Sequence, residues 1–183
     1  MSEAGVFAAD ERCELLDGWI IPRPAQTPPH ATVVGLAHDA LRGALPAGWR
    51  VRIRSAITTA DSEPEPDLTV VRGVPRAYLS HHPGPPEIDL VIEVADSSLA
   101  EDRQLKGRIY GRAVLPIYGI INLVDQQVEV YTDPTGPAAT PGYRQLQAYG
   151  PGDFVPLIIG GQEIGRIAAR ELLPGSPSPS DPR

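Results

Sequence analysis

The sequence has a single cysteine, Cys13, and lacks any run of about 18 apolar residues. One cysteine excludes a disulfide bond within the chain and is typical of a reducing compartment. The missing apolar run excludes an ordinary membrane-spanning helix. The first residues, MSEAGVFAADERCELL, do not have the basic-then-apolar order of a secretory signal. We therefore expect a cytoplasmic protein that has no membrane partner.

The sequence also lacks an excess of positive charge, because its formal net charge is −7. This argues against a protein held on nucleic acid by its overall charge, but it does not exclude an enzyme with a local basic patch. The length of 183 residues suits one domain with its own core. We expect a single domain over residues 10–173 and a disordered tail over residues 174–183, which are rich in proline and serine.

Short apolar or alternating runs predict most of the secondary structure as strands. The segment CELLDGWII has a hairpin signal at Asp17-Gly18. Further strands are predicted at residues 49–55, 67–71, 88–95, 116–123, 127–131, 143–148 and 154–159. Together with the helices described next, they indicate an α+β fold, in which helices pack on a mixed β-sheet and an N-terminal β-hairpin precedes it.

Three helices are predicted between these strands. The first begins at Thr27-Pro28-Pro29 and runs to residue 45, with apolar residues at helical spacing. The second covers residues 99–113, and Ser98 and Glu101 at its start match a capping box. The third is predicted at residues 164–172.

Glu93 interrupts the apolar strand LVIEVA, where a buried carboxylate is unfavourable unless a cation, hydrogen bonds or a pKa shift compensates. Asp67 begins the preceding predicted strand. If the two strands are neighbours, both carboxylates converge at one point. Two carboxylates, a backbone carbonyl and water form an all-oxygen site that suits Mg²⁺ or Mn²⁺. The alternative is that Glu93 faces solvent or pairs with an arginine.

The helix that follows Glu93 carries Asp102, Lys106 and Tyr110 on one face, because they are spaced four residues apart. Lys106 can thus reach back over the end of the Glu93 strand. An ammonium there can orient an attacking water or stabilise a pentacovalent phosphate. The alternative is an ordinary surface pair between Asp102 and Lys106, worth roughly a few tenths of a kcal/mol.

Two further features are candidates for phosphate contacts. Alternation in the strand WRVRIRS puts Arg50, Arg52 and Arg54 on one face, where three guanidiniums can bind a nucleic-acid backbone. A solvated strand face explains the same pattern. His30, at the start of the first helix, is either a phosphate contact or site-lining group, or a simple helix-start histidine.

An ordered set of motifs extends these observations over nearly the whole chain. The segments are CELLDG, a histidine near the first helix, PEPDLTVV, DLVIEVADSS, D-x₃-K-x₃-Y and a strand ending in VYT. The set resembles the Uma-type family of putative restriction endonucleases, a branch of the PD-(D/E)xK nuclease superfamily. The resemblance spans residues 14–172. It implies a restriction-endonuclease-like core, a mixed sheet flanked by helices, with a Mg²⁺-dependent phosphodiesterase site.

The resemblance also implies roles for individual residues. Asp67 takes the place of the motif aspartate, and Glu93 takes the place of the second acidic residue. The superfamily's usual lysine position is Ala95 here, so the pattern is broken. Lys106 matches members in which the lysine has moved to the following helix. Asp67 and Glu93 are then the metal ligands, with the Val94 carbonyl as a third, and Lys106 orients or activates water.

Four supporting residues follow from the same resemblance. Asp102 and Tyr110 match the family's helix motif, whereas Glu14 and His30 match recurrent positions near the front of the family. Glu14 is a candidate additional acid of the metal site. One departure is Tyr118-Gly119, where the family usually shows tyrosine and then tryptophan. This departure concerns local packing or an interface more than the metal site.

The expected function is therefore that of a Mg²⁺-dependent endonuclease, with Mn²⁺ as a possible substitute and DNA as the substrate. Homodimerisation is expected, because two-fold symmetry is the commonest oligomeric arrangement. Two alternatives stay open at this stage. The fold can be catalytically silent and act as a nucleic-acid-binding or protein-interaction module, since fold does not fix function. The site can also belong to a metal-dependent hydrolase of another substrate.

Overall fold

The computed structural model describes residues 12–23 and 25–175. Residues 10 and 11 of the expected domain and residues 176–183 of the expected tail lie outside this part of the chain. At the centre is a six-stranded mixed sheet in the order β3-β4-β5-β6-β7-β8. Its strands are β3 (Trp49–Ile53), β4 (Leu68–Arg72), β5 (Ile88–Ala95), β6 (Ile117–Asn122), β7 (Gln127–Pro134) and β8 (Tyr143–Tyr149). The parallel pair is β5 with β6; the other neighbours are antiparallel.

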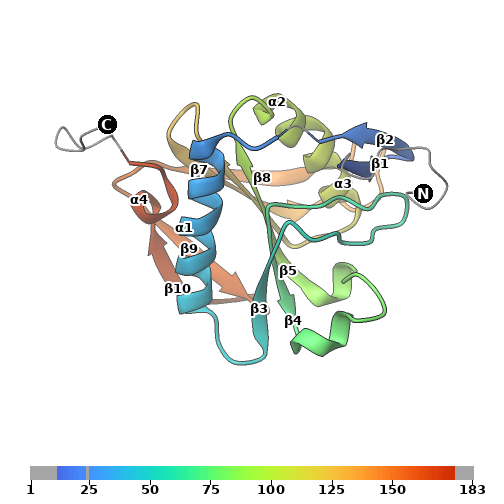
Figure 1. Ribbon diagram of the computed structural model, residues 1–183, viewed down its shortest axis with the longest axis horizontal. Coiled ribbons are helices and arrows are strands. Elements are labelled where there is room, and N and C mark those ends of the chain that lie inside the picture. The colour runs from blue at the N-terminus through green and yellow to red at the C-terminus, as the bar shows by residue number, and fades with distance from the viewer. Residues whose placement is uncertain (1–11, 24, 176–183) are drawn as a thin grey trace.

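Helices and small hairpins cover both faces of this sheet (Figure 1). One face packs on helix α1 (Pro28–Ala44), the hairpin of β9 (Phe154–Ile159) and β10 (Gln162–Ala168), and the short helix α4 (Ala169–Leu172). The other face packs on helix α3 (Gly107–Arg112) and on Leu16 of the hairpin formed by β1 (Cys13–Leu16) and β2 (Trp19–Pro22). The predicted α+β class and N-terminal hairpin are confirmed.

The second predicted helix is present, but it is not a regular α-helix. It consists of α2 (Leu99–Glu101), the π-helical segment η4 (Asp102–Lys106) and α3. The predicted capping box is wrong, because Ser98 makes no side-chain cap hydrogen bond to the backbone. Its hydroxyl instead donates to Asp102 Oδ2 at 2.6 Å. The wider π turn changes which residues share a face, and such turns are frequent at functional sites.

Two other boundaries differ from the sequence-based expectation. The strand predicted at residues 49–55 ends at Ile53, because Arg54 has a φ of 43° and leaves the strand. The helix predicted at 164–172 is replaced by strand β10 and only a short helix, α4. Gly160 and Gly161 both have positive φ, which permits a tight turn that pairs β10 with β9.

Other predicted elements are confirmed. Thr27 is the N-cap of α1 and its hydroxyl accepts a hydrogen bond from the His30 backbone N–H. Strand β5 has the predicted bounds. Gly119 lies within β6 against Ile92, and a Cβ added to Gly119 would lie 3.3 Å from the Ile92 Cγ1. Short 3₁₀ turns, η2 (Pro75–Tyr78) and η3 (Pro85–Glu87), join β4 to β5. Within the described residues, no helix is long and apolar enough to cross a membrane.

Candidate active site

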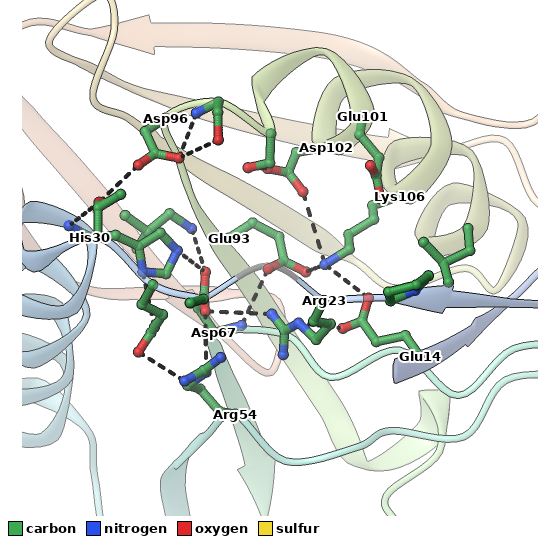
Figure 2. A pocket seen from close by; sticks show the side chains of 18 residues that line it. Glu14, Arg23, His30, Arg54, Asp67, Glu93, Asp96, Glu101, Asp102 and Lys106 are labelled. Carbon is green, nitrogen blue, oxygen red and sulfur yellow. Dashed lines mark hydrogen bonds and ion pairs between the residues drawn. The ribbon is translucent and has the colours of Figure 1, made fainter. Parts of the chain in front are cut away.

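The candidate active site is a polar cavity of about 210 Å³ at one end of the sheet. Figure 2 shows that residues far apart in the sequence turn their side chains into it. They come from the β1–β2 hairpin, the start of α1, the ends of β3, β4 and β5, and the π-helical segment. The site residues that line it are Glu14, Arg23, His30, Arg54, Asp67, Glu93, Val94, Asp102 and Lys106.

Asp67 and Glu93 lie side by side because β4 and β5 are antiparallel neighbours. Leu68 pairs with Ile92. Because the strands are antiparallel, Asp67, which precedes Leu68, lies opposite Glu93, which follows Ile92. The Asp67 backbone N–H donates to Glu93 Oε2 at 3.3 Å, and the Val94 N–H donates to Asp67 Oδ2 at 3.0 Å. Both carboxylates are buried, so the alternative of a solvent-facing Glu93 is wrong.

The two oxygens of Asp67 have different environments. Oδ2 accepts the Val94 N–H and lies 3.0 Å from His30 Nε2, whereas Oδ1 is buried without a hydrogen-bond partner. The nearest cations to Oδ1 are Arg23 at 3.7 Å and Arg54 at 3.9 Å. Burial opposes ionisation of Asp67, but the hydrogen bond and charge of His30 together with the Val94 amide outweigh it and lower the pKa of Asp67.

A chain of hydrogen bonds fixes the orientation of His30. Arg54 Nη1 donates to Gln26 Oε1 at 2.8 Å, and Gln26 Nε2 lies 2.9 Å from His30 Nδ1. With its proton on Nε2, the imidazole accepts from Gln26 and donates to Asp67, which satisfies both contacts. Burial alone would lower the pKa of His30, but Asp67 outweighs it and raises that pKa. His30 therefore acts on the carboxylate rather than only at the helix start.

Lys106 is buried at the centre of the carboxylates. Its Nζ lies 2.8 Å from Glu93 Oε1, 3.5 Å from Glu14 Oε2 and 3.9 Å from Asp102 Oδ1. Only 5% of Lys106 is exposed, so the alternative of a surface pair with Asp102 is wrong. Burial disfavours the ammonium, but the three carboxylates more than offset it and raise the pKa of Lys106.

Glu93 holds its proton more strongly than an ordinary glutamate. Burial is the largest cause, and the neighbouring carboxylates add to it, so the pKa of Glu93 is raised to about 8 although Lys106 opposes the shift. The Tyr110 hydroxyl donates to Glu93 Oε1 at 2.7 Å. Burial also raises the pKa of Asp102 to about 6. Burial and the neighbouring carboxylates thus oppose ionisation of Glu93 and Asp102, and a further cation in the cavity would favour it.

Sequence reasoning missed Arg23 and Gln26. Arg23 lies 3.3 Å from Glu14 and 3.5 Å from Glu65, in addition to its contact with Asp67. Both residues lie in the segment PRPAQTPP between the hairpin and α1. This segment has no periodic pattern that would indicate where their side chains point. The composition gives a further indication that Lys106 has a special role, since it is the only lysine among the 16 lysine and arginine residues of the sequence. All other basic positions are arginine.

The three arginines of the β3 segment do not act as one row. Arg54 leaves the strand and lies in the cavity, whereas Arg50 and Arg52 stay on β3. The Arg52 guanidinium lies over the Tyr78 ring, 5.3 Å from its centroid. The expectation of a continuous three-guanidinium face is therefore wrong, because the positive φ of Arg54 redirects its side chain.

Glu129 anchors the π-helical segment to the sheet from outside the cavity. Its carboxylate accepts hydrogen bonds from Arg103 Nε at 3.1 Å, Asn122 Nδ2 at 2.8 Å and the Tyr131 hydroxyl at 2.7 Å. Burial opposes ionisation, but these donors outweigh it and lower the pKa of Glu129 to about 2. Arg103 adjoins Asp102, so this network holds the backbone that presents Asp102 and Lys106.

Glu129→Gln is expected to reduce the free energy of unfolding by about 2 kcal/mol near neutral pH. The folded pKa lies below the unfolded value of about 4.3, so the carboxylate stabilises the fold above that value and loses its contribution as the pH falls towards 2. Urea unfolding at about pH 6 and pH 3 should show that the difference between wild type and variant narrows in acid. Glu163→Gln, which alters an exposed pair with Arg166, is the control and should show a small difference at both pH values. A difference that is independent of pH for Glu129→Gln would contradict this assignment.

The donor set fits a divalent metal ion. Asp67 Oδ1 is a buried anionic oxygen without a hydrogen-bond donor, and the backbone N–H of the same residue donates to the Glu93 carboxylate. Among the described residues, no three His, Cys, Asp or Glu side chains form a group that could hold a metal ion by themselves. A metal here would therefore need main-chain oxygen and water besides the two carboxylates, as hard cations such as Mg²⁺ commonly do.

Comparisons with known proteins agree with this architecture. The family model described as "Uma2: Putative restriction endonuclease" matches residues 3–165. The crystal structure of "a putative nuclease belonging to DUF820" from Anabaena variabilis is similar, with a TM-score of 0.67 and 15% sequence identity. The match covers 93% of this chain and 94% of that chain, and at this identity it shows the fold alone. No curated protein matches the chain.

Proposed function

Because the chain belongs to the Uma2 family of putative restriction endonucleases, we propose that it is a Mg²⁺-dependent endonuclease that hydrolyses phosphodiester bonds in DNA. One observation carries the proposal. The unpartnered, buried Asp67 Oδ1 lies beside Glu93 in a cavity that also holds the Lys106 ammonium. Two converging carboxylates and an adjacent ammonium suit metal-assisted hydrolysis of a phosphate ester.

Asp67, Glu93 and the Val94 carbonyl would hold the metal ion, with Mn²⁺ as a substitute for Mg²⁺. When bound, the ion would polarise the scissile phosphate, lower the pKa of water and stabilise the leaving oxygen. His30 holds Asp67 in one orientation through its 3.0 Å contact with Oδ2. The Tyr110 hydroxyl does the same for Glu93.

Lys106 has the role of orienting the attacking water and stabilising charge on the phosphate. Its raised pKa keeps the ammonium protonated near neutral pH, so it acts as a cation rather than as a base. Glu14 and Asp102 support it by balancing its charge. Their distances of 3.5 and 3.9 Å leave Glu93 as its closest partner.

Arginines would bind the substrate backbone. Arg54 lines the cavity and would contact a phosphate next to the scissile bond, whereas Arg50 and Arg52 would contact the strand farther along β3. We also propose a homodimer, because two-fold pairing would present one site to each strand of duplex DNA. Light scattering would test this state, and a monomer at working concentrations would contradict it.

Cleavage of plasmid and single-stranded DNA tests the proposed function. Wild type should cut with Mg²⁺ or Mn²⁺, whereas Asp67→Asn/Glu93→Gln, purified identically, should not. Equal cutting by both proteins would identify a contaminant. Binding of DNA without cutting by wild type would instead favour a nucleic-acid-binding module on a nuclease-like fold.

A further inference from the structure

One cation of the candidate active site, Arg23, has no role in the function proposed above. Arg23 directly follows β2, and its backbone N–H donates to the Arg12 carbonyl at 2.9 Å, so the end of the hairpin fixes its position. Its side chain lies in the cavity near Glu14 and Asp67, where only 12% of it is exposed (Figure 2). A charged group buried to this extent needs anionic partners, because it has lost most of its contact with water.

Three carboxylates surround the Arg23 guanidinium, but none lies at the distance of a tight ion pair. Nε lies 3.3 Å from Glu14 Oε1, Nη1 lies 3.5 Å from Glu65 Oε2, and Nη2 lies 3.7 Å from Asp67 Oδ1. Charge-assisted N–H···O hydrogen bonds are about 2.7–2.9 Å long. Nη1 is also buried without a hydrogen-bond partner. The guanidinium is therefore held mainly by charge, and another cation can take over such a contact.

Two of these carboxylates have closer partners than Arg23. Glu65 Oε2 accepts a hydrogen bond from Arg12 Nη2 at 2.9 Å. Glu14 Oε1 accepts the Glu65 backbone N–H at 2.8 Å. Asp67 Oδ1 differs from both, because it is buried without any hydrogen-bond donor. Arg23 thus provides positive charge beside the one oxygen of the three that no donor satisfies.

Arg54 is the other arginine near Asp67 Oδ1, and its setting differs from that of Arg23. Arg54 Nε lies 3.9 Å from Oδ1, but its Nη1 is held by a 2.8 Å hydrogen bond to Gln26. Burial opposes the charge of both arginines. It lowers the pKa of Arg54, whereas at Arg23 the neighbouring carboxylates outweigh it and raise the pKa. Arg23 is therefore the arginine whose charge the acidic cavity stabilises.

The oxygen beside Arg23 is also the one that would bind a divalent ion in the proposed function. Two cations at one buried oxygen repel each other. We propose that Arg23 is the counter-cation of Asp67 in the metal-free protein, and that its guanidinium competes with the divalent ion for Oδ1. Arg23 thereby sets the affinity of the site for metal. This inference rests on the proposed function, because it takes Asp67 as a metal ligand.

Arg23→Gln tests this competition through Mn²⁺ binding in the absence of DNA. Titration followed by electron paramagnetic resonance of free Mn²⁺ gives the dissociation constants of wild type and variant. The variant should bind Mn²⁺ about tenfold more tightly, since a neighbouring positive charge is removed. Arg23→Met removes the same charge but keeps a long unbranched chain, and it should give the same result even if Arg23→Gln does not fold. Arg23→Lys keeps the charge, so its affinity should stay within about twofold of wild type.

Urea unfolding without metal gives a second readout. Arg23→Gln should lower the unfolding midpoint, because the Asp67 carboxylate loses a neighbouring cation. The same substitution should lower it much less in the Asp67→Asn background, where that negative charge is already absent. Arg144→Gln is the control for both measurements, because it removes the same charge from an exposed pair with Asp133 on the edge strand β8. It should leave the Mn²⁺ affinity unchanged.

The outcomes separate this inference from the proposed function. If wild type binds Mn²⁺ and the variants that lack the Arg23 charge bind it equally or more weakly, the inference is overturned and the proposed metal site stands. Equal losses of stability from Arg23→Gln in the two backgrounds would overturn the inference as well. If neither wild type nor these variants bind Mn²⁺, both the inference and the proposed metal site are rejected. Binding by the variants alone would support the inference, with the guanidinium excluding the ion from wild type.

Discussion

Asp67→Asn is expected to lower the rate of metal-dependent DNA cleavage at least about 10³-fold. The substitution keeps the size of the side chain and an oxygen that can accept the Val94 N–H, but it removes the anionic charge of the unpartnered Oδ1. The loss should therefore fall on metal binding rather than on folding. Single-turnover cleavage of a labelled duplex would measure this loss, at saturating Mg²⁺ and at Mg²⁺ concentrations down to about a tenth of that value.

DNA binding gives the matching readout for Asp67→Asn. Removal of a negative charge from a cavity that receives phosphates should leave the affinity for DNA unchanged or increase it. Asp133→Asn is the control, because it makes the same chemical change at an exposed site far along β7. Cleavage by Asp67→Asn within a few-fold of the control would refute the assignment of Asp67 as a metal ligand. Loss of DNA binding together with cleavage would point to a structural role.

Lys106→Met is expected to reduce the free energy of unfolding by about 3 kcal/mol and cleavage by about 10³-fold. The ammonium is the closest cation to Glu93, and it also faces Glu14 and Asp102. Without it, these buried carboxylates repel one another in a poorly solvated place. Urea unfolding without metal would measure the stability, and single-turnover cleavage would measure the activity.

A second variant separates the two effects of Lys106. Lys106→Met/Glu93→Gln removes both partners of the buried pair, so it should recover much of the lost stability, because the pair is removed rather than broken. Its cleavage rate should remain as low as that of the single variants. Recovery of both stability and cleavage would mean that Lys106 has only a structural role. No recovery of stability would mean that Glu93 is not its principal partner.

The sequence predicted that Asp67 and Glu93 converge if their strands are neighbours, because one carboxylate lies inside an apolar strand and the other begins the preceding strand. Antiparallel pairing of β4 with β5 then brings Asp67 and Glu93 together. Lys106 was predicted from the helix periodicity and from the family resemblance. The periodicity could not predict that Lys106 and Asp102 are buried, because the same spacing is typical of a solvent-exposed helix face.

The remaining features depend on tertiary context. A positive φ at Arg54 is not signalled by the local sequence, and it turns the guanidinium from the strand face to Asp67. The π-helical segment is held by side-chain hydrogen bonds, from Ser98 to Asp102 and from Arg103 to Glu129 on β7. Arg23 lies in a segment without regular structure, so only the folded chain places it among three carboxylates.

Direct measurement of Mn²⁺ binding tests the central claim, that the carboxylates of β4 and β5 hold a divalent cation. Electron paramagnetic resonance of free Mn²⁺, during titration of wild type and of Asp67→Asn/Glu93→Gln, would count bound ions without requiring a substrate. The account predicts saturable binding by wild type, competition by Mg²⁺ and loss of that binding in the variant. Equal binding by the two proteins, or no binding by wild type with DNA present, would contradict it.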